Sequence, residues 1–550
     1  MTQSQRTFVR WLLAVLTVAA GARLLGFAVL FAERDLQTDF SVYYTAGQAL
    51  NAGLSPYVNN VSASPPIWDG EAEYRHSRFL YPPLCAVPFR PLAMLPFATA
   101  KIIWTLACLV AVALATGIAA RAVLKEPVAT ALPRPLRGHS SHVAASDNGR
   151  EATTTALPRP LRGHPSRTGR GEANGHSPES RYAGFRASSA TETATLPRAS
   201  LDSAKRSTAG EANDGVGGRD ARPTRDSVSS AYLIVALGAC LFHPLLVNLG
   251  AGQIDAFTLL LLVAAVSLMV APQSRHWAVA GMLLAFACVL KLHCVYLLPF
   301  VLLRRKWAAA AGFAIGAVVV MAATLGSVGW EQAADYVRRD LPRIAQFGEG
   351  GTPDMRLSPE VVAALDAGAP PGWTVKDGRL YQRSSFDAEP NATLIRPLAR
   401  ALARCGLRMQ QTSLSVIVFA CLFLIVCGLE GLAQPARWMD ATQEAAWWLA
   451  ALTIVLLSSP MTWVMNVIWL IPALPLVVRW AGSLQHPWEG RVLAVLVVGL
   501  LLAAMPDGAS CPLLVPYAGR FLHLKYVAAE VLVAASLLAL AVGKSAARKS

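Results

Sequence analysis

The sequence predicts an all-α protein that crosses a membrane many times. The composition, the spacing of the apolar runs and the placement of the basic residues lead to this fold class. Of the 550 residues, 54% are hydrophobic and only 15% are charged, and the mean hydropathy is +0.42. No soluble domain needs so large an apolar fraction, which is typical of a polytopic membrane protein.

Apolar runs close to the ~20 residues of a membrane-spanning helix recur along the chain. The uninterrupted runs are 8–32, 97–124, 231–248, 254–271, 307–328, 412–429, 490–505 and 522–543. Two more runs, 277–303 and 445–480, are interrupted at Lys291-Leu292-His293 and at Ser458-Ser459-Pro460, so each is predicted to form two short passes. We therefore expect about twelve passes. The first run is too long for the core of a signal peptide and is predicted to be a retained helix.

The basic residues of the short loops indicate the orientation of the chain. They all fall on one predicted face: Arg6, Arg10, Arg121, Lys125, Arg275, Arg304, Arg305, Lys306, Arg437, Arg479, Arg491, Lys544, Arg548 and Lys549. Such a face is normally cytoplasmic, which predicts a multi-pass protein of the cell (inner or plasma) membrane with both termini in the cytoplasm. The net charge of +15 follows this pattern and does not indicate nucleic-acid binding.

This orientation places two long loops, 33–96 and 329–411, on the extracytoplasmic side as structured loops. Apolar residues at helical spacing around Tyr43, Tyr44 and Leu50 favour helices lying in the membrane interface. The predicted organisation has three parts: the first two membrane helices with the loop 33–96 (1–124), an insert (125–229), and the remaining helices with the second loop (230–550).

The insert, 125–229, differs sharply in composition from its surroundings. It is rich in Ala, Arg, Gly, Ser, Thr and Pro and poor in large apolar residues, which predicts a disordered cytoplasmic segment. Residues 130–139 recur as a direct repeat at 155–164, without an apolar face that could build a solenoid. A basic tether to anionic lipid is the alternative reading.

Asp39 is the candidate catalytic residue. It is a lone carboxylate beside aromatic residues, just past the first membrane run. A carboxylate fixed at a membrane surface can act as a base on a hydroxyl group. The alternative is a solvated loop aspartate.

Lys291 is the second candidate, because a charge inside a membrane is costly and indicates a function. It lies roughly 21 Å from the cytoplasmic face if each residue of the preceding helix adds 1.5 Å. An anionic phosphate near the outer leaflet would explain its position, and His293 could assist. The alternative is a lysine whose ammonium reaches the interface.

Three polar breaks, 248–255, 391–396 and 458–466, fall on the same predicted outer side. Each alone is typical of a turn, whereas together they suggest a cavity open to the outer leaflet. The nine cysteines form no CxxC pair, so no metal cluster is predicted. We expect no cofactor, and a divalent ion at Asp39 is left open.

The motifs together resemble glycosyltransferase family 87. The motifs that carry the resemblance are Asp39-Phe40-Ser41-Val42-Tyr43-Tyr44, Gly53-Leu54-Ser55-Pro56-Tyr57, Tyr81-Pro82-Pro83-Leu84, Gly252-Gln253, Lys291 with Pro299 and Arg304-Arg305-Lys306-Trp307, Asn391-Ala392-Thr393-Leu394, and Ser459-Pro460 with Trp463. This family contains polyprenyl-phosphate-mannose-dependent alpha-1,2-mannosyltransferases and related arabinofuranosyltransferases of the GT-C fold. The resemblance covers the membrane part in order and excludes only the insert.

The resemblance implies an inverting transfer of a sugar, mannose or another hexose, outside the cytoplasm. The donor would be a polyprenyl phosphate sugar and the acceptor a glycan or glycolipid. Asp39 matches the general base of the family, and Lys291 would stabilise the leaving phosphate. The other matched or neighbouring polar residues are assigned to substrate binding: Tyr43, Tyr44, Tyr57, Tyr81, Gln253, His293, Asn391, Trp463 and Asn466.

Two departures from the family pattern bear on the substrate more than on the fold. Relatives often carry a histidine after Ser-Pro-x-x-Trp, where this chain has Val464, Met465 and Asn466. The lysine is often followed by Pro-x-Pro, where this chain has Leu292-His293-Cys294. The alternatives are an inactive scaffold of the same fold and a transporter or flippase of lipid-linked precursors. A transporter predicts internal repeats, and the sequence shows none across its two halves.

Overall fold

The computed structural model describes the helices of the chain and a small sheet. The described residues are 3–34, 38–57, 79–124, 225–271, 273, 275–342, 355–356, 373–376, 379–382, 392–407, 409–433, 439–460, 462–484, 486–506 and 515–547. The insert up to residue 224 and the substrate-binding candidate Asn391 lie outside these residues. Residues 1–130 and 223–550 belong to one compact unit, and the described elements all lie in it.

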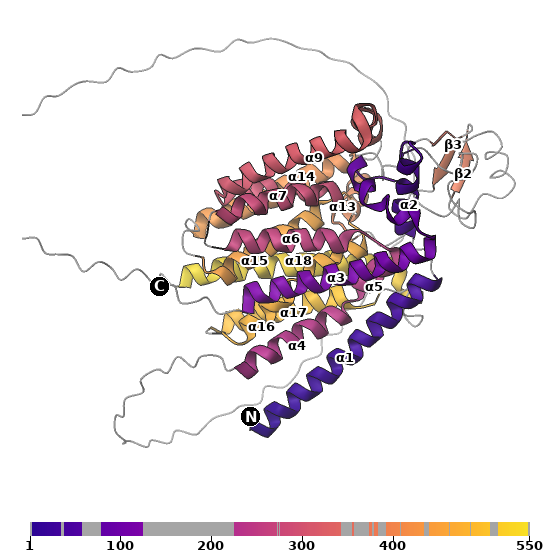
Figure 1. Ribbon diagram of the computed structural model, residues 1–550. Coiled ribbons are helices and arrows are strands. Elements are labelled where there is room, and N and C mark those ends of the chain that lie inside the picture. Colours follow the sequence, from indigo (N-terminus) through magenta and orange to yellow (C-terminus); the bar gives the residue numbers. More distant parts are fainter. Residues whose placement is uncertain are drawn as a thin grey trace, which may run out of the picture. The chain divides into compact units, whose positions relative to one another are not determined.

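Helices make up nearly all of the described structure (Figure 1). The α-helices are α1 (Gln3–Arg34), α2 (Thr38–Asn51), α3 (Phe97–Leu124), α4 (Arg225–Leu241), α5 (His243–Ala251), α6 (Asp255–Val270), α7 (Arg275–Leu290), α8 (Leu297–Leu303), α9 (Trp307–Asp335), α13 (Ile395–Arg404), α14 (Gln411–Ala433), α15 (Ala441–Ser458), α16 (Ala473–Ala481), α17 (Pro487–Ala504) and α18 (Val515–Ala547). The 3-10 helices are η2 (Pro83–Phe89), η3 (Leu92–Met94), η4 (Leu292–Tyr296) and η6 (Val464–Leu470), and a π-helical turn, η5 (Tyr336–Asp340), follows α9.

The polytopic all-α fold class is confirmed. Among the described residues, 8 helices are long and apolar enough to cross a membrane, and the bent pair α4 and α5 gives a ninth candidate. Three shorter apolar helices, Asp255–Val270, Arg275–Leu290 and Leu292–Leu303, lie among them. The total of about twelve passes stays a prediction.

One predicted run is interrupted where we expected a continuous helix. The run 231–248 is wrong as a single helix, because the chain bends by 52° between α4 and α5. Phe242 leaves the helical conformation there, and Pro244 occupies the first turn of α5. Proline has no N–H to donate and its ring clashes with the preceding turn, so the helix must end and restart. Helix α4 also begins at Arg225, inside the range 125–229 that composition assigned to the insert.

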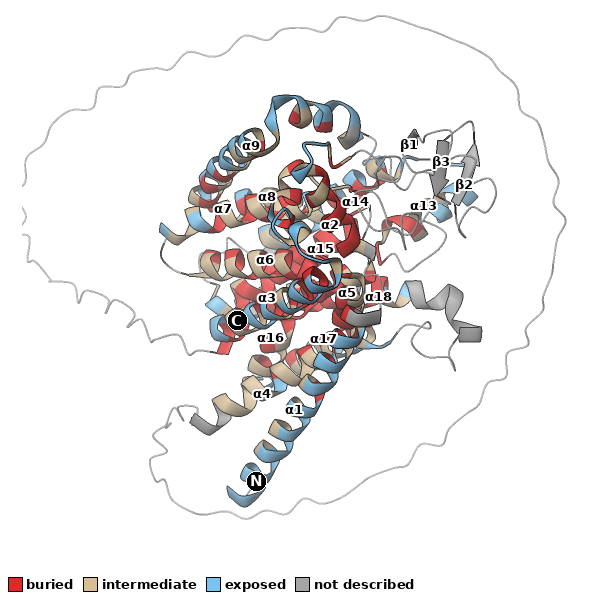
Figure 2. Ribbon diagram, turned by 45° about the vertical axis from the view of Figure 1, so that its right-hand side comes forward, coloured by how far each residue is buried: buried red, intermediate tan, exposed pale blue. Residues whose placement is uncertain are grey.

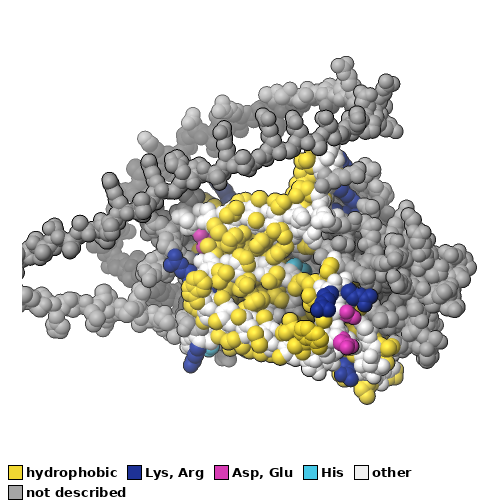
Figure 3. All heavy atoms as spheres, turned by 90° about the horizontal axis from the view of Figure 1, so that it is seen from above, with side chains coloured by type: hydrophobic (Ala, Val, Ile, Leu, Met, Phe, Trp, Pro, Cys, Tyr) yellow, Lys and Arg dark blue, Asp and Glu magenta, His cyan; other side chains and the backbone are white. Residues whose placement is uncertain are grey.

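The core of the bundle is built around α15. Every residue of this helix from Ala445 to Ser458 is buried (Figure 2). By contrast, α9 and α14 expose large apolar side chains such as Val318, Met321 and Leu424. Figure 3 shows a hydrophobic face whose charged side chains gather towards its two ends. An apolar belt between charged ends fits helices that face lipid.

The first long loop folds into α2, η2 and η3, which lie together at one end of the bundle, here called the loop end (Figure 1). Helix α2 packs closely on η2 because Gly47 has no side chain. A Cβ atom at this position would lie 2.6 Å from the carbonyl oxygen of Phe89. The aromatic residues Phe40, Tyr43 and Phe89 are buried in this contact.

The second long loop contains a small antiparallel sheet in an otherwise helical chain. Its strands are β1 (Met355–Arg356), β2 (Trp373–Lys376) and β3 (Arg379–Gln382), in the order β1-β3-β2. Met355 pairs with Leu380, and Thr374 pairs with Tyr381. The sequence analysis expected structure in this loop but no strands.

Candidate active site

Asp39 lies in the first turn of α2, and Tyr43 follows one helical turn later on the same side. Tyr43 is wholly buried, and its ring stacks on Phe89 with the ring centres 4.9 Å apart. Its hydroxyl donates a hydrogen bond to the hydroxyl of Tyr81 at 2.8 Å. The two tyrosines, from opposite ends of the first loop, therefore meet beside Asp39.

Gln253 joins these residues from the turn between α5 and α6. The turn requires Gly252, which adopts a left-handed conformation (φ 68°) that other residues rarely accept. The indole Nε1–H of Trp104 on α3 donates to the carbonyl oxygen of Gly252 at 2.8 Å. The Gln253 N–H donates to the Asn248 carbonyl oxygen at 3.0 Å. These backbone contacts fix the position from which the Gln253 side chain reaches Asp39.

The hydrogen bonds around Gln253 run in one direction. The Tyr43 hydroxyl donates to Tyr81, and the Tyr81 hydroxyl can donate to Gln253 Oε1 at 3.4 Å. The amide Nε2 of Gln253 then donates to Asp39 Oδ2. Because the amide oxygen faces the two phenols, its nitrogen must face the carboxylate. The network thus holds one carboxylate oxygen, Oδ2, in place.

The carboxyl group of Asp39 titrates close to neutral pH. It is half-buried, and the loss of hydration raises its pKa to about 6, while the nearby Lys291 charge and the Gln253 hydrogen bond oppose the rise. Burial also raises the pKa of Tyr81 to about 12 and that of Tyr43 well above its usual value. Both phenols therefore stay protonated at neutral pH, and Asp39 can accept a proton.

Lys291 lies at the break between α7 and η4, where its backbone is extended. Its ammonium forms an ion pair with Asp255, with Nζ 3.2 Å from Oδ2. It also lies 5.6 Å from the centre of the Tyr81 ring. The lysine therefore belongs to the same cluster as Asp39, Gln253 and the two tyrosines.

Asn466 reaches this cluster from η6. Its Nδ2 donates to Asp255 Oδ1 at 2.6 Å, and its Oδ1 accepts the N–H of Trp463 at 2.7 Å. Trp463 thus contacts the Asn466 side chain through its own backbone N–H. The chain next to Asn391 is hydrogen-bonded to the break 458–466, because the Ala392 N–H donates to the Thr462 carbonyl oxygen at 2.6 Å.

Three other candidates make their contacts with residues other than Asp39 and Gln253. The Tyr44 hydroxyl donates to the Leu95 carbonyl oxygen at 2.7 Å, which anchors α2 to the segment after η3. The Tyr57 hydroxyl donates to the Tyr81 carbonyl oxygen at 2.6 Å and thus braces Tyr81. The His293 ring lies against Trp469, with the ring centres 5.3 Å apart.

Asp255 is a site residue that was not predicted from the sequence. This aspartate is wholly buried in the first turn of α6, and it touches both Lys291 and Asn466. The available signal was its position as the only charged residue of the polar break 248–255. A buried acid of this kind needs a partner of opposite charge, and Lys291, in the predicted apolar interior, is such a partner.

The described residues hold no group of three or more His, Cys, Asp or Glu side chains placed to bind a metal ion. The expectation that the protein works without a cofactor stays a prediction.

Comparison with known families gives the class of this protein. The model of glycosyltransferase family 87 matches residues 79–141 and 212–376. Over these two ranges, which together are less than half of its residues, the chain is similar to this glycosyltransferase family. It is therefore a glycosyltransferase with several membrane helices. The matched ranges include Tyr81, Gln253, Asp255 and Lys291, whereas Asp39 and Asn466 lie outside them. A search of curated proteins found no match.

The family match is interrupted from 142 to 211, within the predicted insert. We expect that replacing residues 142–211 with a short Gly/Ser linker will leave transfer activity within about twofold of the parent, because their composition is too poor in large apolar residues to form a core. Activity per mole of purified protein is the measurement. A linker of the same composition and the original length serves as the control, and lost activity in a well-expressed shortened protein would contradict the prediction.

Proposed function

We propose that this glycosyltransferase moves a sugar, mannose or another hexose, from a polyprenyl phosphate donor to a hydroxyl group of a glycan or glycolipid. One observation carries the proposal: a carboxylate suited to act as a base, Asp39, and a cation inside the helix bundle, Lys291, belong to one cluster at the loop end. These are the two charged groups that such a transfer needs.

In the proposed reaction, Asp39 removes the proton of the acceptor hydroxyl as its oxygen attacks the anomeric carbon of the donor sugar. The bond between this carbon and the phosphate oxygen breaks, and the phosphate leaves with the electron pair. A direct attack of this kind inverts the anomeric configuration. Lys291 stabilises the charge of the leaving phosphate. The acceptor hydroxyl is a poor nucleophile, so removal of its proton accelerates the attack.

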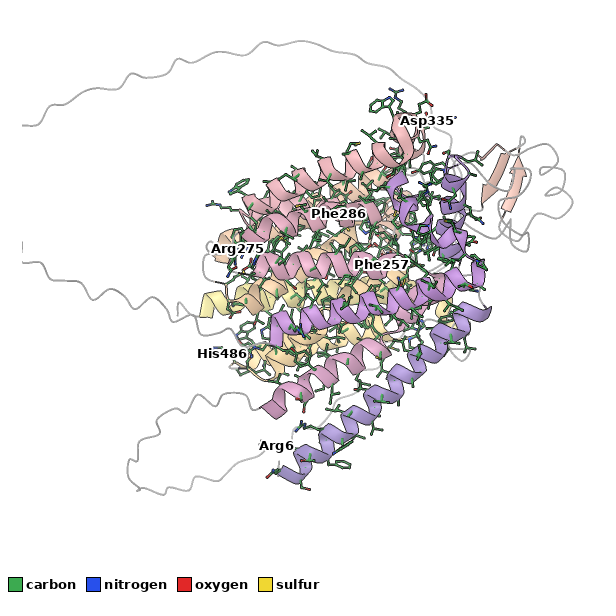
Figure 4. All side chains as sticks on the ribbon, viewed as in Figure 1. Arg6, Phe257, Arg275, Phe286, Asp335 and His486 are labelled. Carbon is green, nitrogen blue, oxygen red and sulfur yellow. The ribbon has the colours of Figure 1, made fainter. Side chains whose placement is uncertain are left out.

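The distribution of charged residues supports an extracytoplasmic site. Asp335 lies at the loop end of the bundle, whereas Arg6 and Arg275 lie at the opposite end (Figure 4). Positive charge favours the cytoplasmic side, which makes the loop end extracytoplasmic and both chain termini cytoplasmic in a cell membrane. A lipid-linked donor in the outer leaflet would then meet the cluster directly.

The proposal is tested with the purified protein in lipid nanodiscs. The donor is a synthetic polyprenyl phosphate carrying labelled mannose, offered with short mannosides and with extracted membrane glycolipids. We expect a labelled product of inverted anomeric configuration and release of one polyprenyl phosphate per sugar transferred. Transfer from a nucleotide sugar, with none from the polyprenyl phosphate sugar, would overturn the proposal. Other polyprenyl phosphate sugars in the same assay identify the sugar.

A further inference from the structure

Asp255 has surroundings unlike those of Asp39. Its side chain is wholly buried, with the Asn466 amide on Oδ1 at 2.6 Å and the Lys291 ammonium near Oδ2 at 3.2 Å. It also begins α6, where the helix N-terminus favours a negative charge. Each side-chain oxygen thus has a partner, and the carboxylate is held between three segments of the chain: α6, the α7–η4 break and η6.

Lys291 makes fewer polar contacts than Lys306, a buried lysine of the same bundle. The Lys306 ammonium lies 2.8 Å from Glu444 Oε1, 2.9 Å from the Met269 carbonyl oxygen and 3.8 Å from the centre of the Trp277 ring. Among the described residues, the Lys291 ammonium has one ion-pair partner, Asp255, and the more distant Tyr81 ring. An ammonium has three donors, so Lys291 keeps capacity for an added anion.

Asp39 and Asp255 both act on Lys291. Asp255 forms the ion pair with Lys291, and the lysine charge also opposes the rise in the pKa of Asp39. An ammonium that moved from Asp255 to Asp39 would stabilise the Asp39 carboxylate and make it a weaker base. It would also leave the place where the donor phosphate is proposed to bind.

We infer that Asp255 is a positioning residue: it holds Lys291 in an ion pair away from Asp39, so that the lysine serves the donor phosphate and Asp39 remains free to accept a proton. Asn466 supports this role by fixing the Asp255 carboxylate. The inference rests on the proposed function, because it assigns Asp39 and Lys291 the roles given there.

The test is a double-mutant cycle in the nanodisc assay, with kcat/KM measured against pH. Among the described residues, the charged and titratable groups that interact with Asp39 are Lys291, Asp255 and the phenols of Tyr43 and Tyr81, and Gln253 donates to it. In Asp255→Asn we expect donor KM to rise about tenfold and the acid limb of the profile to move down by about one pH unit, because Lys291 then pairs with Asp39. In the Lys291→Met background, Asp255→Asn should move the acid limb by a clearly smaller amount. The inference would be overturned if Asp255→Asn moved the acid limb equally in the parent and in Lys291→Met, or if it did not move the limb in the parent.

A second variant covers the case in which Asp255→Asn does not fold. Asn466→Ala keeps every charge but removes the hydrogen bond that fixes Asp255, so we expect a smaller shift of the acid limb in the same direction, again dependent on Lys291. The matched control is Glu530→Gln, which replaces another wholly buried acidic side chain, on α18, and should leave the acid limb in place.

Failure of the inference can be told from failure of the proposed function. If Asp39→Asn keeps the acid limb, or if Lys291→Met leaves donor KM unchanged, the roles of the base or the phosphate site are wrong. If both behave as proposed and only the dependence on Asp255 is missing, the positioning role alone is rejected.

Discussion

Replacing Asp39 with asparagine is expected to lower the transfer rate by about 10²-fold or more in a protein that still folds. Asparagine keeps the size of the side chain, and its carbonyl oxygen can still accept the hydrogen bond from Gln253. It cannot take a proton from the acceptor hydroxyl, so the effect should fall on kcat. Turnover of the purified variant with the polyprenyl phosphate sugar is the measurement.

Asp335→Asn is the matched control, because this aspartate also lies at the loop end but is exposed and pairs only with Arg339 at 3.7 Å among the described residues (Figure 4). We expect its turnover to equal that of the parent, since an exposed pair contributes little. Near-normal turnover of Asp39→Asn, with an unchanged melting temperature, would remove Asp39 from the role of base.

The pH profile gives an independent check on Asp39. Burial raises its pKa to about 6, so the free protein has the carboxylate form above pH 6 and the protonated form below it. A base must be deprotonated to act, and kcat/KM should therefore fall as the pH decreases through about 6. The fall should be tenfold per pH unit at lower pH. A flat profile between pH 5 and 7 would contradict the assignment.

The sequence predicted the helical framework well because the membrane imposes a strong and simple constraint on it. Runs such as 97–124 reappear as helices with almost the same bounds, since a stretch of that length in lipid must satisfy its backbone within a helix. The bend at Phe242 was missed because a count of apolar residues over the run gives no weight to the single Pro244, which cannot continue a helix. The spans and the interruptions after Leu290 and Ser458 were thus predictable from the sequence, but this bend was not.

The cluster was only partly predictable for a different reason. Asp39, Tyr43, Gln253 and Lys291 each stood out within their own segment, but nothing in the sequence gives the distances between these segments. Asp255 was overlooked because a single acid at a turn is usually solvated, and its burial becomes visible only when Lys291 and Asn466 are seen around it. The ion pair is a tertiary contact between α6 and the α7–η4 break, and local patterns do not report such contacts.

Replacing Lys291 with methionine is expected to raise the apparent donor KM by about tenfold and also to lower kcat by about tenfold. Methionine has a similar length without the charge. If Lys291 contacts the donor phosphate both before and during transfer, binding and turnover must both suffer. Lys291→Arg should recover only part of the loss, because the planar guanidinium cannot occupy the site of a compact ammonium beside Asp255 and the Tyr81 ring. The measurement is initial rate against donor concentration for the three proteins.

Lys306→Met distinguishes a lysine that binds substrate from one that holds the helices together. Lys306 is also buried, but its ammonium contacts Glu444, the Met269 carbonyl oxygen and the Trp277 ring. Its loss leaves the Glu444 carboxylate without this partner, so the melting temperature should fall while donor KM stays near that of the parent. Lys291→Met also leaves a buried carboxylate, Asp255, without its ion-pair partner, so the two variants are told apart by the large change in donor KM expected for Lys291→Met alone. Unchanged kcat and KM in Lys291→Met would mean that the lysine only neutralises Asp255, and the donor phosphate would then have to bind elsewhere on the loop end.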